Sequence, residues 1–143
     1  MSINTANIVE KIKESDLSLS QLLKPEEFCD RGQYADKLAK EFKKSLNPTQ
    51  LRKFFYSIKA IEIKLKNKED KDPLPTTYAR KIITLIPELA YAKGRNLIPQ
   101  EFYELMSACL SPKRLKTVGD LKCLDLFLTA LLAYHKYYKE GGR

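Results

Sequence analysis

Apolar residues recur every three or four positions along much of the chain, the spacing that places them on one face of an α-helix. The pattern is clearest over residues 48–68. There the apolar face consists of Leu51, Phe54, Phe55, Ile58, Ile61 and Leu65. Asn47 precedes this segment and Pro48 opens it, a pair that is typical of a helix start. The pattern therefore predicts one long amphipathic helix that ends near Lys68.

Four further segments show helical spacing. They cover about residues 33–45, 77–93, 99–111 and 117–139. Pro87 lies inside the second of these and predicts a kink, because its ring does not fit a straight helix. We expect Gly94 to act as the C-cap of that helix. Thr117 and Asp120 have the spacing of a capping box and predict the start of the last helix.

The last segment also predicts where the core lies. Residues 121–132 are apolar nearly all round, which is typical of a central, buried helix. Residues 1–30 hold three basic and six acidic residues, with shorter helical repeats. We predict an all-α fold, a compact bundle of about five helices with an N-terminal helical segment. Residues 31–143 form the single domain, and the acidic residues 1–30 either dock on it or stay flexible until a partner binds.

Composition removes several classes of protein. No Gly-x-Gly occurs in the 143 residues, so we expect no dinucleotide-binding fold with a glycine-rich loop. No run of 18 apolar residues is present that could cross a membrane. The first twenty residues carry no pattern of a secretory signal, so the expected location is the cytoplasm. The three cysteines form no Cys-x-x-Cys, and one histidine cannot complete a zinc cluster.

The sequence offers little for catalysis. His135 is the only histidine, and its aromatic, basic context favours a packing or surface role. The acidic loop at residues 69–72 lacks the spacing and the glycine of a calcium-binding loop. Cys109 and Cys123 fall in apolar segments, where cysteine usually acts as a small hydrophobic residue. We therefore expect no catalytic residue, no metal and no cofactor.

Positive charge is concentrated in one part of the chain. The formal charge is +8, and residues 36–68 hold ten Lys or Arg against three Asp or Glu, which leaves +7 there. A local excess favours a binding surface. At 100° per residue, Arg52, Lys59 and Lys66 form a stripe at the edge of the apolar face, beside Tyr56. This row suits phosphates and an exposed base, and a solvated lysine face is the alternative.

Two other places combine cations with tyrosines. Lys93 and Arg95 lie in the segment 91–95, where the alternative is a helix end whose cations complement the dipole. Lys136 and Lys139 lie in the segment 133–139, whose three tyrosines and two lysines could stack on and clamp a strand. The alternative there is that two of these tyrosines belong to the core and bond through their hydroxyls.

Three motifs occur in a fixed order, QLRKFF at 50–55, LAYAKGR at 89–95 and LAYHKYY at 132–138. Together they resemble the small, second subunit of the Csm complex, the type III-A CRISPR–Cas effector that targets RNA. The resemblance covers roughly residues 33–139, and nothing is carried over to residues 1–30.

The resemblance implies a non-catalytic helical subunit, present in several copies, that takes part in antiviral defence. It implies contact with single-stranded target RNA and guide RNA through phosphates, without reading sequence. It also implies that the subunit bridges its neighbours, with other Csm subunits and copies of itself as partners and no membrane. By position it assigns RNA contact to Arg52, Lys53, Lys93 and Arg95, and helix geometry adds Lys59 and Lys136.

Two other functions fit the same residues. A DNA-binding helical regulator would need a short helix-turn-helix pair, and no compact pair is evident among these long helices. A purely structural helical adaptor would present the same basic face to an acidic protein.

Overall fold

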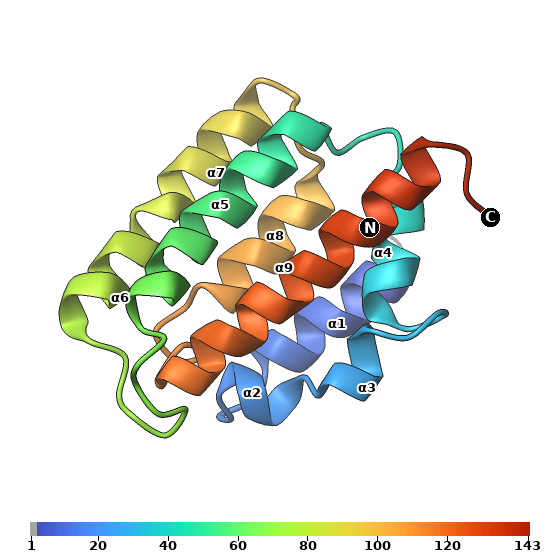
Figure 1. Ribbon diagram of the computed structural model, residues 1–143. Coiled ribbons are helices and arrows are strands. Elements are labelled where there is room, and N and C mark those ends of the chain that lie inside the picture. The colour runs from blue at the N-terminus through green and yellow to red at the C-terminus, as the bar shows by residue number, and fades with distance from the viewer. Residues whose placement is uncertain (1–2) are drawn as a thin grey trace.

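The computed structural model describes residues 3–143 and, within the first helix, the side chains from residue 6 onward (Figure 1). The helices are α1 (Ile3–Lys13), α2 (Leu19–Leu22), α3 (Pro25–Phe28), α4 (Tyr34–Glu41), α5 (Pro48–Lys64), α6 (Thr76–Ile83), α7 (Leu85–Gly94), α8 (Gln100–Cys109) and α9 (Val118–Lys139). Within residues 3–143 there is no strand, only an isolated bridge between Pro73 and Thr117. The prediction of a compact all-α fold is confirmed.

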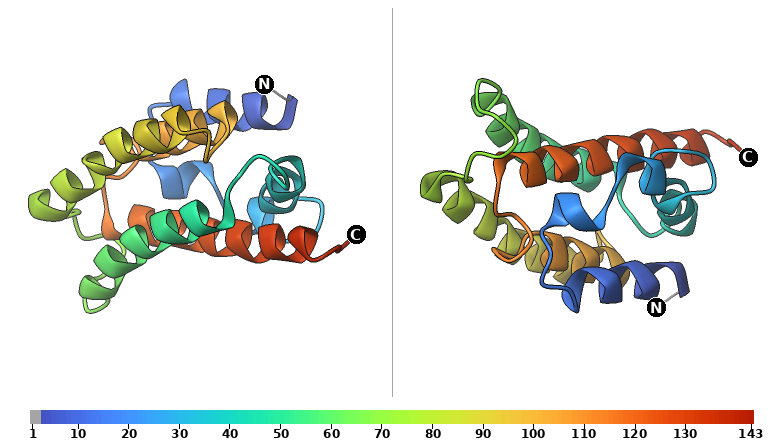
Figure 2. Two further views of the ribbon diagram at one scale, coloured as in Figure 1. Left: turned by 90° about the horizontal axis from the view of Figure 1, so that it is seen from above. Right: turned by 90° about the horizontal axis from the view of Figure 1, so that it is seen from below.

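The helices form two layers, seen edge-on in Figure 2. One layer contains α5 and α9, which run in opposite directions, with α4 against α9. The other contains α6, α7, α8 and α1, with α8 between α7 and α1. The short helices α2 and α3 lie between the layers along one edge and contact α9. The two layers enclose one apolar core.

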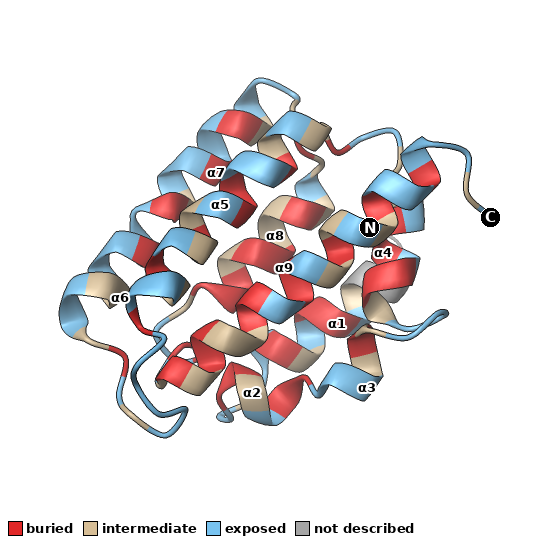
Figure 3. Cartoon of the chain, viewed as in Figure 1, coloured by how far each residue is buried: buried red, intermediate tan, exposed pale blue. Residues whose placement is uncertain are grey.

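The long helices form as their sequences predict. Asn47 caps α5, its Oδ1 accepting from the backbone N–H of Thr49 at 2.9 Å and of Gln50 at 3.1 Å. All six apolar residues of the predicted α5 face are buried. The capping box at the start of α9 is also present, with Thr117 and Asp120 bonding each other's backbone N–H. Figure 3 shows buried and exposed residues alternating around α5 and α9, as expected for helices with one buried side.

Three details differ from the sequence predictions. The helix predicted at 33–45 ends at Glu41, and α5 ends at Lys64, four residues before the predicted Lys68. The helix predicted at 77–93 is interrupted at one residue, Thr84, which keeps helical dihedrals (φ of −66°, ψ of −13°), because Pro87 lacks an N–H and its ring clashes with the carbonyl four residues earlier. The prediction that Gly94 is the C-cap is wrong. Gly94 is the last helical residue, and the left-handed conformation falls at Asn96, with φ of 60°.

Residues from the N-terminal segment contribute to the same core. Ile8 and Ile12 of α1 are fully buried, and α1 packs on α8. Arg114, only 3% exposed, donates to the backbone carbonyls of Ser15 and Leu17. A buried guanidinium needs hydrogen-bond acceptors. By holding these two carbonyls, Arg114 fixes the course of the chain between α1 and α2.

Candidate nucleic-acid interface

The fold brings together three helix ends that are distant in sequence. The N-terminal end of α5 lies near the C-terminal ends of α7 and α9, because α5 runs opposite to both (Figure 1). Each of the three sequence motifs supplies one of these ends. The basic pair Arg52 and Lys53 of α5 therefore lies between residues of the second and third motifs. Since the two are adjacent, they point about 100° apart around α5 and meet different neighbours.

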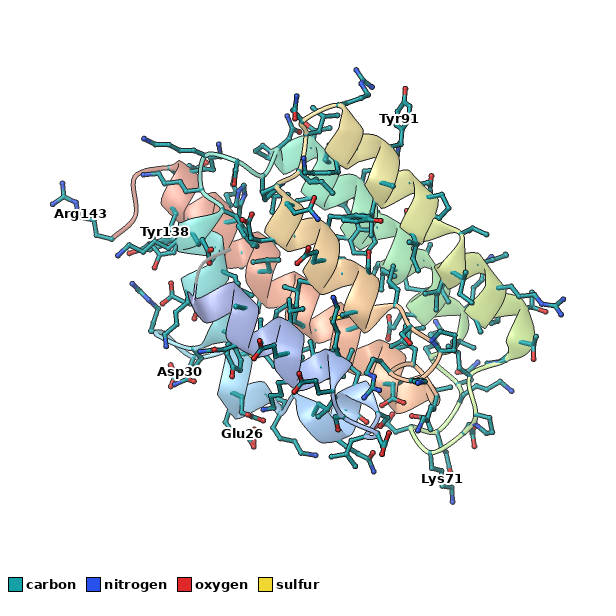
Figure 4. The ribbon with its side chains drawn as sticks, turned by 180° about the vertical axis from the view of Figure 1, so that it is seen from behind. Glu26, Asp30, Lys71, Tyr91, Tyr138 and Arg143 are labelled. Carbon is teal, nitrogen blue, oxygen red and sulfur yellow. The ribbon has the colours of Figure 1, made fainter. Side chains whose placement is uncertain are left out.

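Lys53 and Arg95 line a groove between α5 and α7, which we call the α5–α7 groove. Its other lining residues are Gln50, Pro87, Glu88, Tyr91, Ala92 and Leu97, and its volume is about 270 Å³. Tyr91 is 69% exposed, and Figure 4 shows it pointing away from the body of the protein. The guanidinium of Arg95 lies 5.8 Å from the centre of the Tyr91 ring, within the range of a cation–π contact.

Arg52 lines a second groove, between α5 and α9, which we call the α5–α9 groove. Its other lining residues are Pro48, Leu132, His135, Lys136, Lys139 and Glu140, and its volume is also about 270 Å³. Lys136 pairs with Glu140 at 2.9 Å, and both side chains are about two-thirds exposed. An exposed ion pair of this kind adds little to stability, so Lys136 can leave Glu140 and bind another anion at a small cost in free energy. The groove combines three cations from two helices.

Two predicted contact residues lie outside both grooves. Lys59 donates to Asp125 of α9 at 3.0 Å and pairs with Glu62 at 3.7 Å. The hydrogen bond to Asp125 raises the pKa of Lys59, so this cation is already engaged within the fold. Lys93 is half-buried and lines neither groove. It points about 200° away from Arg95 around the α7 axis, toward the other flank of the helix.

The tyrosine-rich segment of α9 is largely structural. Tyr134 donates to the carbonyl of Cys29 at 2.6 Å, and Tyr138 is buried and donates to the carboxylate of Asp36. His135 is 1% exposed, its Nε2 lies 3.3 Å from a backbone carbonyl, and burial lowers its pKa. Tyr134 and Tyr138 therefore belong to the core, as the alternative interpretation predicted. Stacking on a base would fall to the exposed Tyr137.

The structure adds two residues that the sequence reasoning did not single out, Gln50 and Glu88, which line the α5–α7 groove. Lys139, predicted together with Lys136 in segment 133–139, joins it in the α5–α9 groove. Gln50 and Glu88 carry no comparable signal, because only the packing of α7 over α5 brings them together.

In residues 3–143 no group of three or more His, Cys, Asp or Glu side chains is placed to hold a metal ion. Burial raises the pKa of Cys109 and of Cys123 to about 12, which keeps both thiols protonated and poor as nucleophiles. Among these helices none is both long and apolar enough to span a bilayer.

Fold and grooves together define a small, basic, all-helical protein that exposes two cationic grooves at one end. The family model described as Csm2 Type III-A matches residues 25–141. The chain therefore belongs to the Csm2 family of type III-A CRISPR systems, and the family predicted from the three motifs is confirmed. Searches of curated proteins and of solved structures found no match. Family membership makes the chain a subunit of a Csm complex, which assembles with other Csm subunits.

Proposed function

We propose that this chain is the non-catalytic small subunit of a cytoplasmic type III-A complex in antiviral defence, where it binds the backbone of guide and target RNA and bridges neighbouring subunits. The observation that carries the proposal is that two basic grooves open on either side of the N-terminal end of α5. The contacting residues are Arg52 and Lys136 in one groove and Lys53 and Arg95 in the other. Lys59 and Lys93 line neither groove and are left out of this set.

Electrostatics supports contact with phosphates. The four cations come from α5, α9 and the C-cap of α7, which a common core holds in place, so little backbone freedom is lost in bringing them together. The N-terminal end of α5 adds the positive end of a helix dipole between the two grooves. Lys and Arg on helix ends contact phosphate without reading base edges, which suits a complex in which guide pairing supplies specificity.

The salt dependence of RNA binding tests this proposal. If each copy neutralises four phosphates of a single strand, a plot of log K against log salt should have a slope of about −2.8. The variant with Arg52, Lys53, Arg95 and Lys136 all changed to alanine should flatten most of this slope. RNA strands of the same length but different sequence should bind with equal affinity, because phosphates carry no sequence information.

A matched control removes the same charge elsewhere. Lys64, Lys66, Lys68 and Lys113 are exposed and line neither groove, so changing these four to alanine also removes four positive charges. The control variant should keep most of the slope. Equal slopes for the two variants would contradict the grooves as the contact site. No salt-dependent RNA binding by the wild-type chain would favour the structural adaptor, and tighter binding to duplex DNA would favour the regulator.

A further inference from the structure

The α5–α7 groove differs from the α5–α9 groove in one respect that phosphate binding does not require. Its rim carries an exposed aromatic ring, Tyr91, whereas the α5–α9 groove has no exposed aromatic ring among its lining residues. Tyr91 is 69% exposed and shares the lining of this groove with the cations Lys53 and Arg95. Aromatic rings next to cations are the usual platform for unpaired bases in single-stranded nucleic acid.

We propose that the α5–α7 groove holds one unpaired nucleotide of RNA, with its base stacked on Tyr91 and its flanking phosphates on Lys53 and Arg95. This inference rests on the proposed RNA-binding function and adds a base contact to it. The cations occupy opposite walls of the groove, Lys53 on α5 and Arg95 on α7, so a strand that crosses the groove passes both.

The groove has the size and lining of a site for one ring system. Its volume of about 270 Å³ lies below the range of about 300–1,000 Å³ that is usual for drug-sized ligands. A smaller cavity of about 40 Å³ shares Gln50, Lys53, Glu88 and Ala92 with the groove, and its lining includes Phe54 and Phe102. A base is flat and apolar on its faces, so apolar residues beside an aromatic rim suit it better than they suit a phosphate.

Glu88 and Arg95 give the two ends of the groove opposite charges. Glu88 precedes Arg95 by two turns of α7, about 10 Å along the helix axis. Its carboxylate repels phosphate at that end and can accept from the amino group of a base. The phosphates are therefore expected at the end of the groove near Arg95. Arg95 lies over one side of the Tyr91 ring, which leaves the other side for a stacked base.

Tyrosine variants and abasic RNA test this site in the full-length chain. Tyr91→Ala should weaken binding to single-stranded RNA by about fivefold to tenfold, the lower part of the range for loss of one stacked base. Tyr91→Phe should bind as wild type, because the ring remains. On RNA of the same length with abasic positions, Tyr91→Ala and wild type should bind equally. The salt slope should be unchanged throughout, since no charge is removed.

Tyr56→Ala is the matched control. Tyr56 is 59% exposed on α5 and lines neither groove, so its loss should change the affinity less than twofold. Equal affinities of Tyr91→Ala and Tyr56→Ala, or an equal loss for Tyr91→Ala on intact and abasic RNA, would overturn the base site and leave the phosphate contacts standing. Absence of any salt-dependent binding by the wild-type chain would instead overturn the proposed function, and this site with it.

Discussion

Replacing Asp120 by asparagine tests how the N-terminal segment is held to the bundle. Asp120 is fully buried at the start of α9. Its Oδ1 accepts from the backbone N–H of Ser20 at 2.9 Å and from the Ser20 hydroxyl at 2.6 Å. Its Oδ2 accepts from the backbone N–H groups of Lys116 and Thr117, both at 2.9 Å. One carboxylate thus joins α2 to the N-terminal end of α9.

The cost of the change follows from this geometry. Asparagine keeps one acceptor oxygen, and its amide nitrogen is best placed toward Ser20, whose hydroxyl can turn and accept from it. The backbone N–H of Ser20 then has no acceptor. A buried donor without an acceptor costs about 1–3 kcal/mol, and the remaining hydrogen bonds lose the extra strength that a charged acceptor gives them. We expect Asp120→Asn to lower the free energy of unfolding by about 2–4 kcal/mol, a large part of the roughly 5–15 kcal/mol that stabilises a domain.

Urea denaturation followed by far-ultraviolet circular dichroism measures this difference. Asp16→Asn is the matched control, because Asp16 is an exposed acid of the same segment and its change should stay within about 0.5 kcal/mol. Ser20→Ala removes only one donor and should cost about 1 kcal/mol. The reasoning is refuted if Asp120→Asn is no less stable than Ser20→Ala.

The same carboxylate makes stability depend on pH. Burial raises the pKa of Asp120, but hydrogen bonds from Ser20 and Thr117 outweigh it and hold the pKa below its ordinary value. The folded pKa is therefore below the unfolded value of about 3.9. The stabilisation is complete above the unfolded pKa and is lost as the pH falls through the folded one. Between about pH 5 and pH 2, Asp120→Asn should lose stability less steeply than wild type.

Three other predictions concern the bundle. Lys59→Met should cost about 1–2 kcal/mol in urea denaturation, less than for a fully buried pair because the Lys59 side chain is 38% exposed, and it should leave the RNA salt slope unchanged; a flatter slope would return Lys59 to the contact site. Asn47→Ala should cost about 1 kcal/mol through loss of the α5 cap, and no change in the urea midpoint would contradict it. Burial raises the pKa of Cys109 and Cys123 to about 12, so at pH 8 both should react with iodoacetamide, followed by mass spectrometry, far more slowly in the folded chain than in urea.

Local pattern predicted the elements that depend on local chemistry. The apolar face of α5 and the caps at Asn47 and Thr117 need only neighbouring residues, and the structure has all three. The helix ends were less accurate, because a helix ends where tertiary contacts stop supporting it. The exchange of roles between Gly94 and Asn96 shows this, since either residue tolerates a left-handed turn and the packing of the following segment decides between them.

The sequence did not separate the cations that can contact RNA from those that cannot, because a charged side chain can already be paired within the fold. Lys59 lies on the predicted basic stripe, but its partner Asp125 is 66 residues away in the chain. No local sequence pattern predicts this pair. Lys93 could have been separated from Arg95 by helical angle alone, since residues two apart lie on opposite sides. The meeting of Lys53 with Arg95 depends on the layer arrangement of α5 and α7, which sequence periodicity does not determine.

The position of the grooves has an electrostatic reason that total charge does not show. The C-terminal ends of α7 and α9 carry the negative ends of their helix dipoles, which by themselves would repel a phosphate. Arg95 follows the last residue of α7, and Lys136 and Lys139 lie in the last turn of α9, so cations offset these dipoles where α5 presents its positive end. By contrast, Lys64, Lys66 and Lys68 add charge at the other end of α5, where the same dipole is negative and neither groove reaches. The fold therefore separates the cations of residues 48–68 into a pair at the end of α5 suited to phosphate and a group at the other end that neither groove reaches, and each four-alanine variant includes residues from one of these ends.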